Sequence, residues 1–238
     1  MIELIKKIIS ITGFQVRRIQ KYPTTDLERR FKLFETFGIN KIIDVGANVG
    51  QYALLVKELG FSGQIISFEP LSSAFSALKE VSDKHNNWQA HNYALGNENT
   101  ETVINISENS FSSSILNMLP QHLKSAPAST FIDTEKIQIR TLDSIFDTLH
   151  TASDKILLKI DTQGFEKKVL EGAGNSLHKI TGIQLEMSIV LLYKSELILE
   201  EMITYLKNSG FTLYSLENGF YDQKNGQLLQ VDGLFFRN

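Results

Sequence analysis

The chain has 238 residues, a net charge of −3, and apolar and charged contents of 42% and 21%. This composition is ordinary for a globular protein of one or two domains, and its charge balance gives no sign of a nucleic-acid partner. The sequence contains no cysteine, which excludes disulfides, thiolate metal sites and cysteine nucleophiles. No apolar run approaches the roughly 20 residues that cross a bilayer.

Residues 1–21 combine isoleucines near helical spacing with several basic side chains. Such a helix could lie on an anionic membrane surface, but we favour a helix packed over one end of the domain. Lys6 and Lys7 interrupt the apolar region, which disfavours a secretory signal and predicts a cytoplasmic protein. A further helix is predicted over 26–37. We therefore expect an N-terminal helical extension at 1–39, followed by one main domain at 40–238.

The most informative pattern comes next. An apolar run carries Asp44 into the glycine-bearing turn GANVG at 46–50. The amphipathic residues 51–59 follow with helical spacing, and a second β-like run, 64–68, leads to Glu69. The order strand, glycine turn, helix, strand and acid builds a nucleoside site at the carboxyl ends of parallel strands.

The chemistry of this turn limits the cofactor. Gly46 and Gly50 allow positive φ and close backbone approach. The spacing is G-x-x-x-G, with Asn48 where a dinucleotide site would have its middle glycine. Asp44 before the turn disfavours a pyrophosphate and suits a cofactor with a cationic amino-acid end, such as S-adenosylmethionine. Glu69 would then accept hydrogen bonds from the ribose hydroxyls; the alternative is a turn whose glycines serve only tight packing.

The middle of the chain is less regular. A helix is predicted at 73–81, and strands are predicted at 88–95, 102–106 and 136–141. The serine-rich segment 107–135 is typical of a mobile loop, with one short helix around 115–123. Loops of this length in compact domains are usually functional covers or disordered segments. We favour a substrate cover, because the flanking strands would end near the cofactor; a disordered insertion is the alternative.

The last third returns to alternating strands and helices. Residues 155–160 form a buried strand that ends in Asp161, and a glycine turn leads into a helix from Glu166. The next strand, 182–187, carries Glu186 near its end. A helix follows at 196–208, and two strands at 211–216 and 228–236 then form a hairpin. This order predicts an α/β class I methyltransferase (Rossmann-like) fold, a seven-stranded mixed sheet with helices on both faces and an antiparallel C-terminal hairpin.

Over about 40–236 the chain resembles the FkbM-type S-adenosylmethionine-dependent methyltransferases. The resemblance rests on IIDVGANVGQYA, SFEP, NYALGNEN and, above all, LLKIDTQGFEKKVLEGA. Members of this family methylate hydroxyl groups, commonly on sugars, polysaccharides or macrolide-like products. The resemblance implies an O-methyltransferase with a sugar, glycan or other small-molecule acceptor. Gln163 departs from the family pattern, in which an apolar or acidic residue is expected before the glycine, and we expect it to tune substrate choice.

The resemblance also implies roles for single residues. Glu69 would bind the ribose hydroxyls of the cofactor, and Asn92 would contact its adenine. The methionine end would be held by residues at the first turn, namely Asp44, Gly46, Asn48 and Gly50.

Methyl transfer from a sulfonium needs alignment of the reacting atoms, exclusion of water and a base for the acceptor hydroxyl. Asp161 is the first candidate base, because the fourth strand of this architecture ends beside the transferable methyl. Glu186 is the second and Glu166 the third, although a Glu in the first turn of a helix is often only a dipole partner. Each carboxylate could instead be a hydrogen-bonded loop anchor. His122, in the serine-rich segment, is a further candidate.

Two alternatives stay open. Asp161 and Glu186 could together hold a divalent metal such as Mg²⁺, which would acidify a hydroxyl. We do not favour a metal, because no third ligand is evident and the histidines lack metal-like spacing. The alternative function is a nucleotide-binding oxidoreductase or a non-catalytic binding module of Rossmann-like topology.

Overall fold

The computed structural model describes residues 25–237, so the helix and membrane contact considered for residues 1–21 lie outside the described residues. The main sheet contains β1 (Lys41–Val45), β2 (Gln64–Phe68), β3 (Trp88–His91), β7 (Ile156–Ile160), β8 (Gly182–Ser188), β9 (Thr212–Asn218) and β10 (Gln230–Phe236). Their order is β3-β2-β1-β7-β8-β10-β9, and β10 runs antiparallel to β8 and β9 while the other pairs are parallel. This topology confirms the predicted α/β, Rossmann-like fold.

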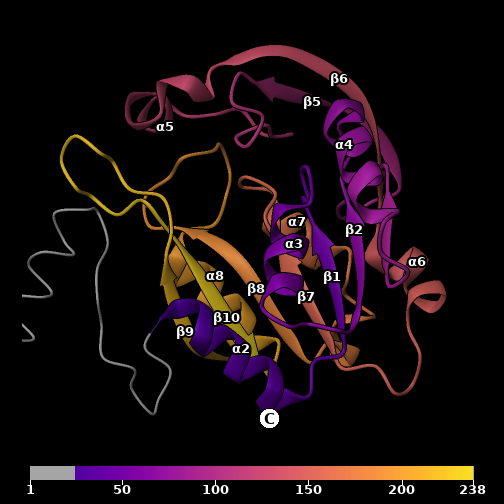
Figure 1. The fold of residues 1–238 in the computed structure, drawn as a ribbon. Coiled ribbons are helices and arrows are strands. Elements are labelled where there is room, and N and C mark those ends of the chain that lie inside the picture. Colours follow the sequence, from indigo (N-terminus) through magenta and orange to yellow (C-terminus); the bar gives the residue numbers. More distant parts are fainter. Residues whose placement is uncertain (1–24, 238) are drawn as a thin grey trace, which may run out of the picture.

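Helices cover both faces of the sheet (Figure 1). Successive side chains of a strand point to opposite faces, so the neighbours Ile42 and Ile43 belong to different apolar clusters. Ile42 packs in a cluster with Phe34 and Val56 on one face, and Ile43 packs in a cluster with Leu206 on the other. The helices are α2 (Asp26–Phe37), α3 (Gln51–Glu58), α4 (Ser72–Ser82), α6 (Leu142–Leu149), α7 (Glu166–Glu171) and α8 (Leu199–Asn208).

The helix α2 begins and ends where the sequence predicts. Thr25 and Glu28 form a capping box at its start, and Gly38 ends it in the left-handed region with φ of 64°. A buried ion pair between Arg30 and Glu217 joins α2 to β9. The described part of the N-terminal extension is therefore fastened to the edge of the main sheet.

A second, three-stranded sheet lies beside the main one. It has the order β4-β6-β5, with β4 at Ala94–Leu95, β5 at Thr100–Ser107 and β6 at Phe131–Arg140. Figure 1 shows β5 and β6 in an arch above the main sheet, with α5 (Pro120–Ser125) at its far end. The prediction of one strand over 88–95 is wrong, because Asn92 turns its side-chain amide to the carbonyls of Glu69 and Pro70 and ends the strand pairing at β3.

The helix α6 was not predicted, although its signals are in the sequence. The side chain of Thr141 accepts a hydrogen bond from the Ser144 amide and caps the helix. The apolar residues that follow have helical spacing and are buried, at Leu142, Ile145, Phe146 and Leu149. The helix lies between β6 and β7 and returns the chain from the small sheet to the main one.

The serine-rich segment 107–135 contains the short helix α5 and the first residues of β6, and side-chain hydrogen bonds join its remaining parts. Buried Ser112 and Ser129 join their hydroxyls at 2.9 Å, and Asn109 donates to both. The Ser113 hydroxyl accepts from the Ser107 amide. The short helix α5 begins at Pro120 rather than near residue 115, since a proline is well placed at a helix start. The serine hydroxyls thus supply hydrogen bonds in a segment whose backbone has few partners in regular secondary structure.

Candidate active site

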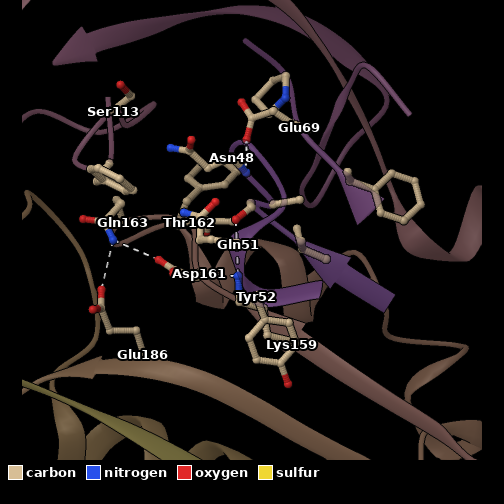
Figure 2. Close-up of a pocket in the computed structure, with 18 of the residues that line it drawn as sticks. Asn48, Gln51, Tyr52, Glu69, Ser113, Lys159, Asp161, Thr162, Gln163 and Glu186 are labelled. Carbon is tan, nitrogen blue, oxygen red and sulfur yellow. Dashed lines mark hydrogen bonds and ion pairs between the residues drawn. The ribbon is translucent and has the colours of Figure 1, made fainter. Parts of the chain in front are cut away.

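A cavity of about 790 Å³ opens at the carboxyl ends of the parallel strands. Figure 2 shows its side chains converging from the first turn, from the end of β2, and from β7 and β8. Ligands of open α/β sheets bind at such an edge, where the strands deliver their following loops to one place. Among its described lining residues are Asn48, Tyr52, Glu69, Lys159, Asp161, Gln163, Gln184, Glu186 and Asp232.

The glycine turn is shaped by backbone contacts. The amides of Gly46 and Ala47 both donate to the carbonyl of Phe68, at 3.0 Å each. Gly46 has a φ of 75°, and a Cβ added to it would lie 1.8 Å from the carbonyl oxygen of Asp161. Asn48 follows with a φ of 48°, a conformation that Asn tolerates better than most residues. The turn therefore has to start with glycine to reach the end of β7.

Glu69 lies at the predicted place, at the end of β2 and in the cavity wall. Its two carboxylate oxygens accept hydrogen bonds from the amides of Asn48, at 2.8 Å, and Leu71, at 2.9 Å. Burial outweighs these bonds and raises the pKa of Glu69 to about 7. The carboxylate thus fixes the first turn against β2 and keeps further acceptor capacity for hydroxyl donors in the cavity.

Asp44 does not line the cavity as expected. Its side chain is fully buried, its Oδ1 lies 3.1 Å from Lys159 Nζ, and its Oδ2 accepts a bond from Ser67. Lys159, which lines the cavity, is the ion-pair partner of this acid, and the contact of Asp44 with the methionine end stays a prediction. Burial opposes the charged ammonium, but Asp44 and Asp161 outweigh it and raise the pKa of Lys159 to about 12.

Asp161 and Glu186, the first two candidate bases, line the cavity side by side (Figure 2). The side-chain amide of Gln163 donates to both, at 2.9 Å to Asp161 and 3.1 Å to Glu186. The Asp161 side chain is 42% exposed, and Lys159 Nζ lies 3.7 Å from its Oδ2. Glu186 is more enclosed, and burial together with Asp161 raises its pKa well above the usual value.

Three other predicted residues lie elsewhere. Glu166 is buried beneath the turn that follows β7 and accepts bonds from the amides of Thr162 and Gly164, so it is a loop anchor. The Asn92 amide is occupied by two carbonyls and is not among the described residues of the cavity wall. His122 packs against Tyr193, and burial lowers the pKa of His122 to about 4. None of them faces the cavity.

Several polar side chains of the cavity are not among the site residues predicted from the sequence. Asp232 pairs with Glu186 across β10 and β8, and burial raises its pKa to about 6. The Tyr52 hydroxyl donates to Gln184 at 2.8 Å, and its ring lies 5.2 Å from Lys159 Nζ. A signal was present, since each of these polar residues interrupts an otherwise apolar strand or the buried side of a helix.

Within residues 25–237 no group of three or more His, Cys, Asp or Glu residues is arranged to hold a metal ion. Asp161 and Glu186 share a neutral amide donor at the point where they approach each other. None of the described helices is long and apolar enough to cross a membrane.

Comparison with known proteins agrees with this geometry. Residues 44–213 match the family described as the methyltransferase FkbM domain. The chain belongs to this family. The matched region of this FkbM domain runs from Asp44 into β9 and contains the glycine turn, Glu69, Asp161 and Glu186.

Individual relatives of the FkbM domain are distant. Methyltransferase 1 of Beauveria bassiana (strain ARSEF 2860) is 26% identical over 142 residues, which cover 55% of this chain and 57% of the relative. The solved structure of the methyltransferase FkbM from Methylobacillus flagellatus KT aligns with a TM-score of 0.50 and 15% identity, over 82% of this chain and 43% of that chain. The FkbM domain thus spans about half the length of these proteins.

Proposed function

We propose that this FkbM domain transfers a methyl group from S-adenosylmethionine to a hydroxyl group of a small-molecule acceptor, such as a sugar, a glycan or a natural product. The observation that carries the proposal is one cavity that joins the glycine turn and Glu69 to the paired Asp161 and Glu186. A nucleoside site and a candidate base therefore share the same carboxyl-end edge of the sheet.

The charge of the cavity supports a cationic cofactor. Its described charged lining residues are five carboxylates and two cations, namely Glu58, Glu69, Asp161, Glu186 and Asp232 with Arg30 and Lys159. A sulfonium and an ammonium group gain from such surroundings, whereas a pyrophosphate would be repelled. Gly46, Ala47 and Asn48 of the first turn line the cavity, where the methionine end could approach them. The residues present fit S-adenosylmethionine better than a dinucleotide.

S-adenosylmethionine supplies an electrophilic methyl group on its sulfonium sulfur. In our proposal Glu69 accepts hydrogen bonds from the ribose hydroxyls, and the 46–50 turn contacts the methionine end. The acceptor oxygen would bond to the methyl carbon as the carbon–sulfur bond breaks and S-adenosylhomocysteine leaves, and Asp161 would accept the proton of the acceptor hydroxyl. Lys159 keeps a positive charge beside this carboxylate. Glu186, which is more enclosed, is the second candidate base.

The segment 107–135 is proposed as the substrate cover. Ser110, Phe111, Ser113 and Ile115 line the cavity, and the Asn48 side chain donates to the Ser110 carbonyl at 3.4 Å. Phe111 is 60% exposed although it belongs to the cavity wall, so it offers an apolar surface to an acceptor. A cover in this position would exclude water from the reacting atoms.

The cofactor assignment is tested by calorimetric titration of the chain with S-adenosylhomocysteine and, separately, with NADH. We expect binding of S-adenosylhomocysteine and no heat from NADH. Binding of NADH alone would overturn the proposal in favour of a nucleotide-binding oxidoreductase, and binding of neither would favour a non-catalytic module.

The base is tested by Asp161→Asn, which keeps the shape of the side chain but cannot take a proton. With isotope-labelled S-adenosylmethionine and a panel of free sugars and glycans, we expect methyl transfer to fall by about 10²- to 10⁴-fold. S-adenosylhomocysteine affinity should change little, and the exposed control Asp133→Asn should behave like the wild type. Full transfer by Asp161→Asn would exclude this base. Loss of transfer in EDTA, restored by Mg²⁺, would support a metal instead.

A further inference from the structure

The Gln163 side chain stands in the candidate active site between the carboxylates of Asp161 and Glu186 (Figure 2). We propose that Gln163 is a positioning residue of the methyl transfer, whose amide holds Asp161 and Glu186 next to each other in the cavity. This inference rests on the proposed function and adds a role that neither carboxylate could fill alone.

The side-chain amide of Gln163 has the donors and the acceptor that its three neighbours require. Its NH₂ group has two hydrogens, and one goes to Asp161 Oδ1 and the other to Glu186 Oε2. Its carbonyl oxygen accepts from the Tyr193 hydroxyl at 2.8 Å, which fixes the amide orientation with the donors toward the acids. A glutamate here could not donate two bonds, and a third carboxylate would repel the other two.

The backbone around Gln163 is held in an uncommon conformation. Gln163 has a φ of 54° and Gly164 a φ of 94°, both in the left-handed region. A Cβ on Gly164 would lie 2.7 Å from Cβ of Tyr193, so the turn and this tyrosine are in close contact. Structures keep such conformations where the surroundings over-determine them, and they are concentrated at functional sites.

The cover segment also reaches this residue. The Ser114 hydroxyl donates to the backbone carbonyl of Gln163 at 2.7 Å, and Tyr193 Oη lies 3.4 Å from the carbonyl of Ser112. Gln163 is thus fixed by the cover segment on its backbone and by Tyr193 on its side chain. Its position ties the cover to the two acids.

Without the amide, two carboxylates would approach each other with few donors between them. Among the described residues Glu186 keeps one other side-chain donor, the amide of Gln230, at 2.7 Å. The ionisable groups that act on Glu186 from the packed elements are Asp161, Asp232, Glu166 and Lys159, and Tyr193 lies close enough to interact with it. Arg30 and Glu217 act in turn on Asp232. Most of them are acids, so removal of the amide donors should favour the protonated carboxyl form of Glu186.

The test compares Gln163→Glu and Gln163→Met with the control Gln138→Glu, which makes the same charge change at an exposed position of β6. Each protein, without added ligand, is labelled with ¹³C at the glutamate carboxyl and titrated by NMR. The Glu186 signal is assigned by its absence in Glu186→Gln. We expect its titration midpoint to rise by about 1 pH unit in Gln163→Met, to rise further in Gln163→Glu, and to stay in place in Gln138→Glu.

The ordered shift is a signature that a merely structural role would not produce. If both Gln163 variants melt as the wild type does and the Glu186 midpoint stays in place, Gln163 does not position the acids. If a Gln163 variant fails to fold, Tyr193→Phe removes only the hydroxyl that orients the amide, and an unchanged midpoint there overturns the inference. S-adenosylhomocysteine titration of the wild type separates the two claims, because its failure refutes the proposed function and leaves the NMR result standing.

Discussion

Lys159 is the penultimate residue of the apolar strand β7, ILLKI, and forms ion pairs with two acids at the cavity. It lies between Asp44, which is fully buried, and Asp161, which reaches the cavity. Removing one partner of a buried ion pair leaves the other charge without compensation in the interior. The strand register decides this partnership, because Asp44 and Lys159 are direct neighbours across β1 and β7.

Lys159→Met should therefore lower the free energy of unfolding by about 3–5 kcal/mol, measured by urea denaturation. The double variant Asp44→Asn, Lys159→Met should recover part of this loss, because the uncompensated carboxylate is gone. Equal stabilities of the single variant and the wild type would show that the pair contributes little.

Glu69 provides a second residue-scale prediction. Glu69→Gln replaces one acceptor oxygen by a donor, so S-adenosylhomocysteine should bind more weakly by about 1–3 kcal/mol, as measured by calorimetry. The exposed variant Glu80→Gln is the control. Because the pKa of Glu69 is raised to about 7, the wild-type affinity should fall as the pH drops below that value, and Glu69→Gln should lack this dependence. A pH-independent wild-type affinity contradicts the assigned role.

At the scale of elements, the glycine turn and the end of β7 form one unit. The turn after β1 contacts the backbone of Asp161, and Glu69 ties the same turn to the end of β2. The turn at 162–164 is likewise anchored by Glu166. The end of β1 is thus fixed by contacts from β2 and β7, whereas the end of β7 is also fixed by the first residue of its own helix, α7.

Gly46→Ala tests this unit with a matched control. Gly60 has a φ of 101° and no atom within 4 Å of an added Cβ, so Gly60→Ala carries backbone strain alone. We expect Gly60→Ala to cost about 1 kcal/mol of stability. Gly46→Ala should cost clearly more and abolish S-adenosylhomocysteine binding, because its Cβ meets a carbonyl at 1.8 Å. Equal effects of the two variants in denaturation and calorimetry would contradict the contact.

At the scale of the whole molecule, buried acids in the cavity wall and beneath the turn after β7 make the free energy of unfolding depend on pH. Burial raises the pKa of Glu69 and Glu166 to about 7 and that of Asp232 to about 6. Between their unfolded values, 4.5 for Glu and 3.8 for Asp, and these folded values, the folded protein binds protons that the unfolded chain has released. Their contribution to stability is complete at the low end of this window and is lost as the pH rises through about 7.

The free energy of unfolding of the ligand-free protein should therefore decrease by about 1–3 kcal/mol between about pH 5 and about pH 8. Urea denaturation across this range measures the slope. The double variant Glu69→Gln, Asp232→Asn should make this slope smaller but leave part of it, because Glu166 still titrates, whereas Glu80→Gln should leave the slope unchanged. A stability that rises over the same range would mean that the acids are ionised in the folded protein at lower pH than these values imply.

The local signals in the sequence were sufficient for the main sheet. Hydrophobic periodicity and glycine placement depend on neighbouring residues, so the strand–turn–helix order around Asp44 and the terminal hairpin could be predicted from them. Two features could not be predicted in this way: the end of the third strand before Asn92, and the conformation of 107–135. Both depend on side chains that form hydrogen bonds with residues far along the chain.

The sequence by itself determined the fold class and the family resemblance. It also placed Glu69 and Asp161 directly after strands and Glu186 near the end of one, because the position and length of a strand follow from local pattern. Only the tertiary structure decided which acid faces the cavity. Register placed Lys159 against Asp44 and withdrew that acid from the cavity, and a left-handed turn carried Gln163 between Asp161 and Glu186. Such pairings join residues far apart in the chain, and no local pattern encodes them.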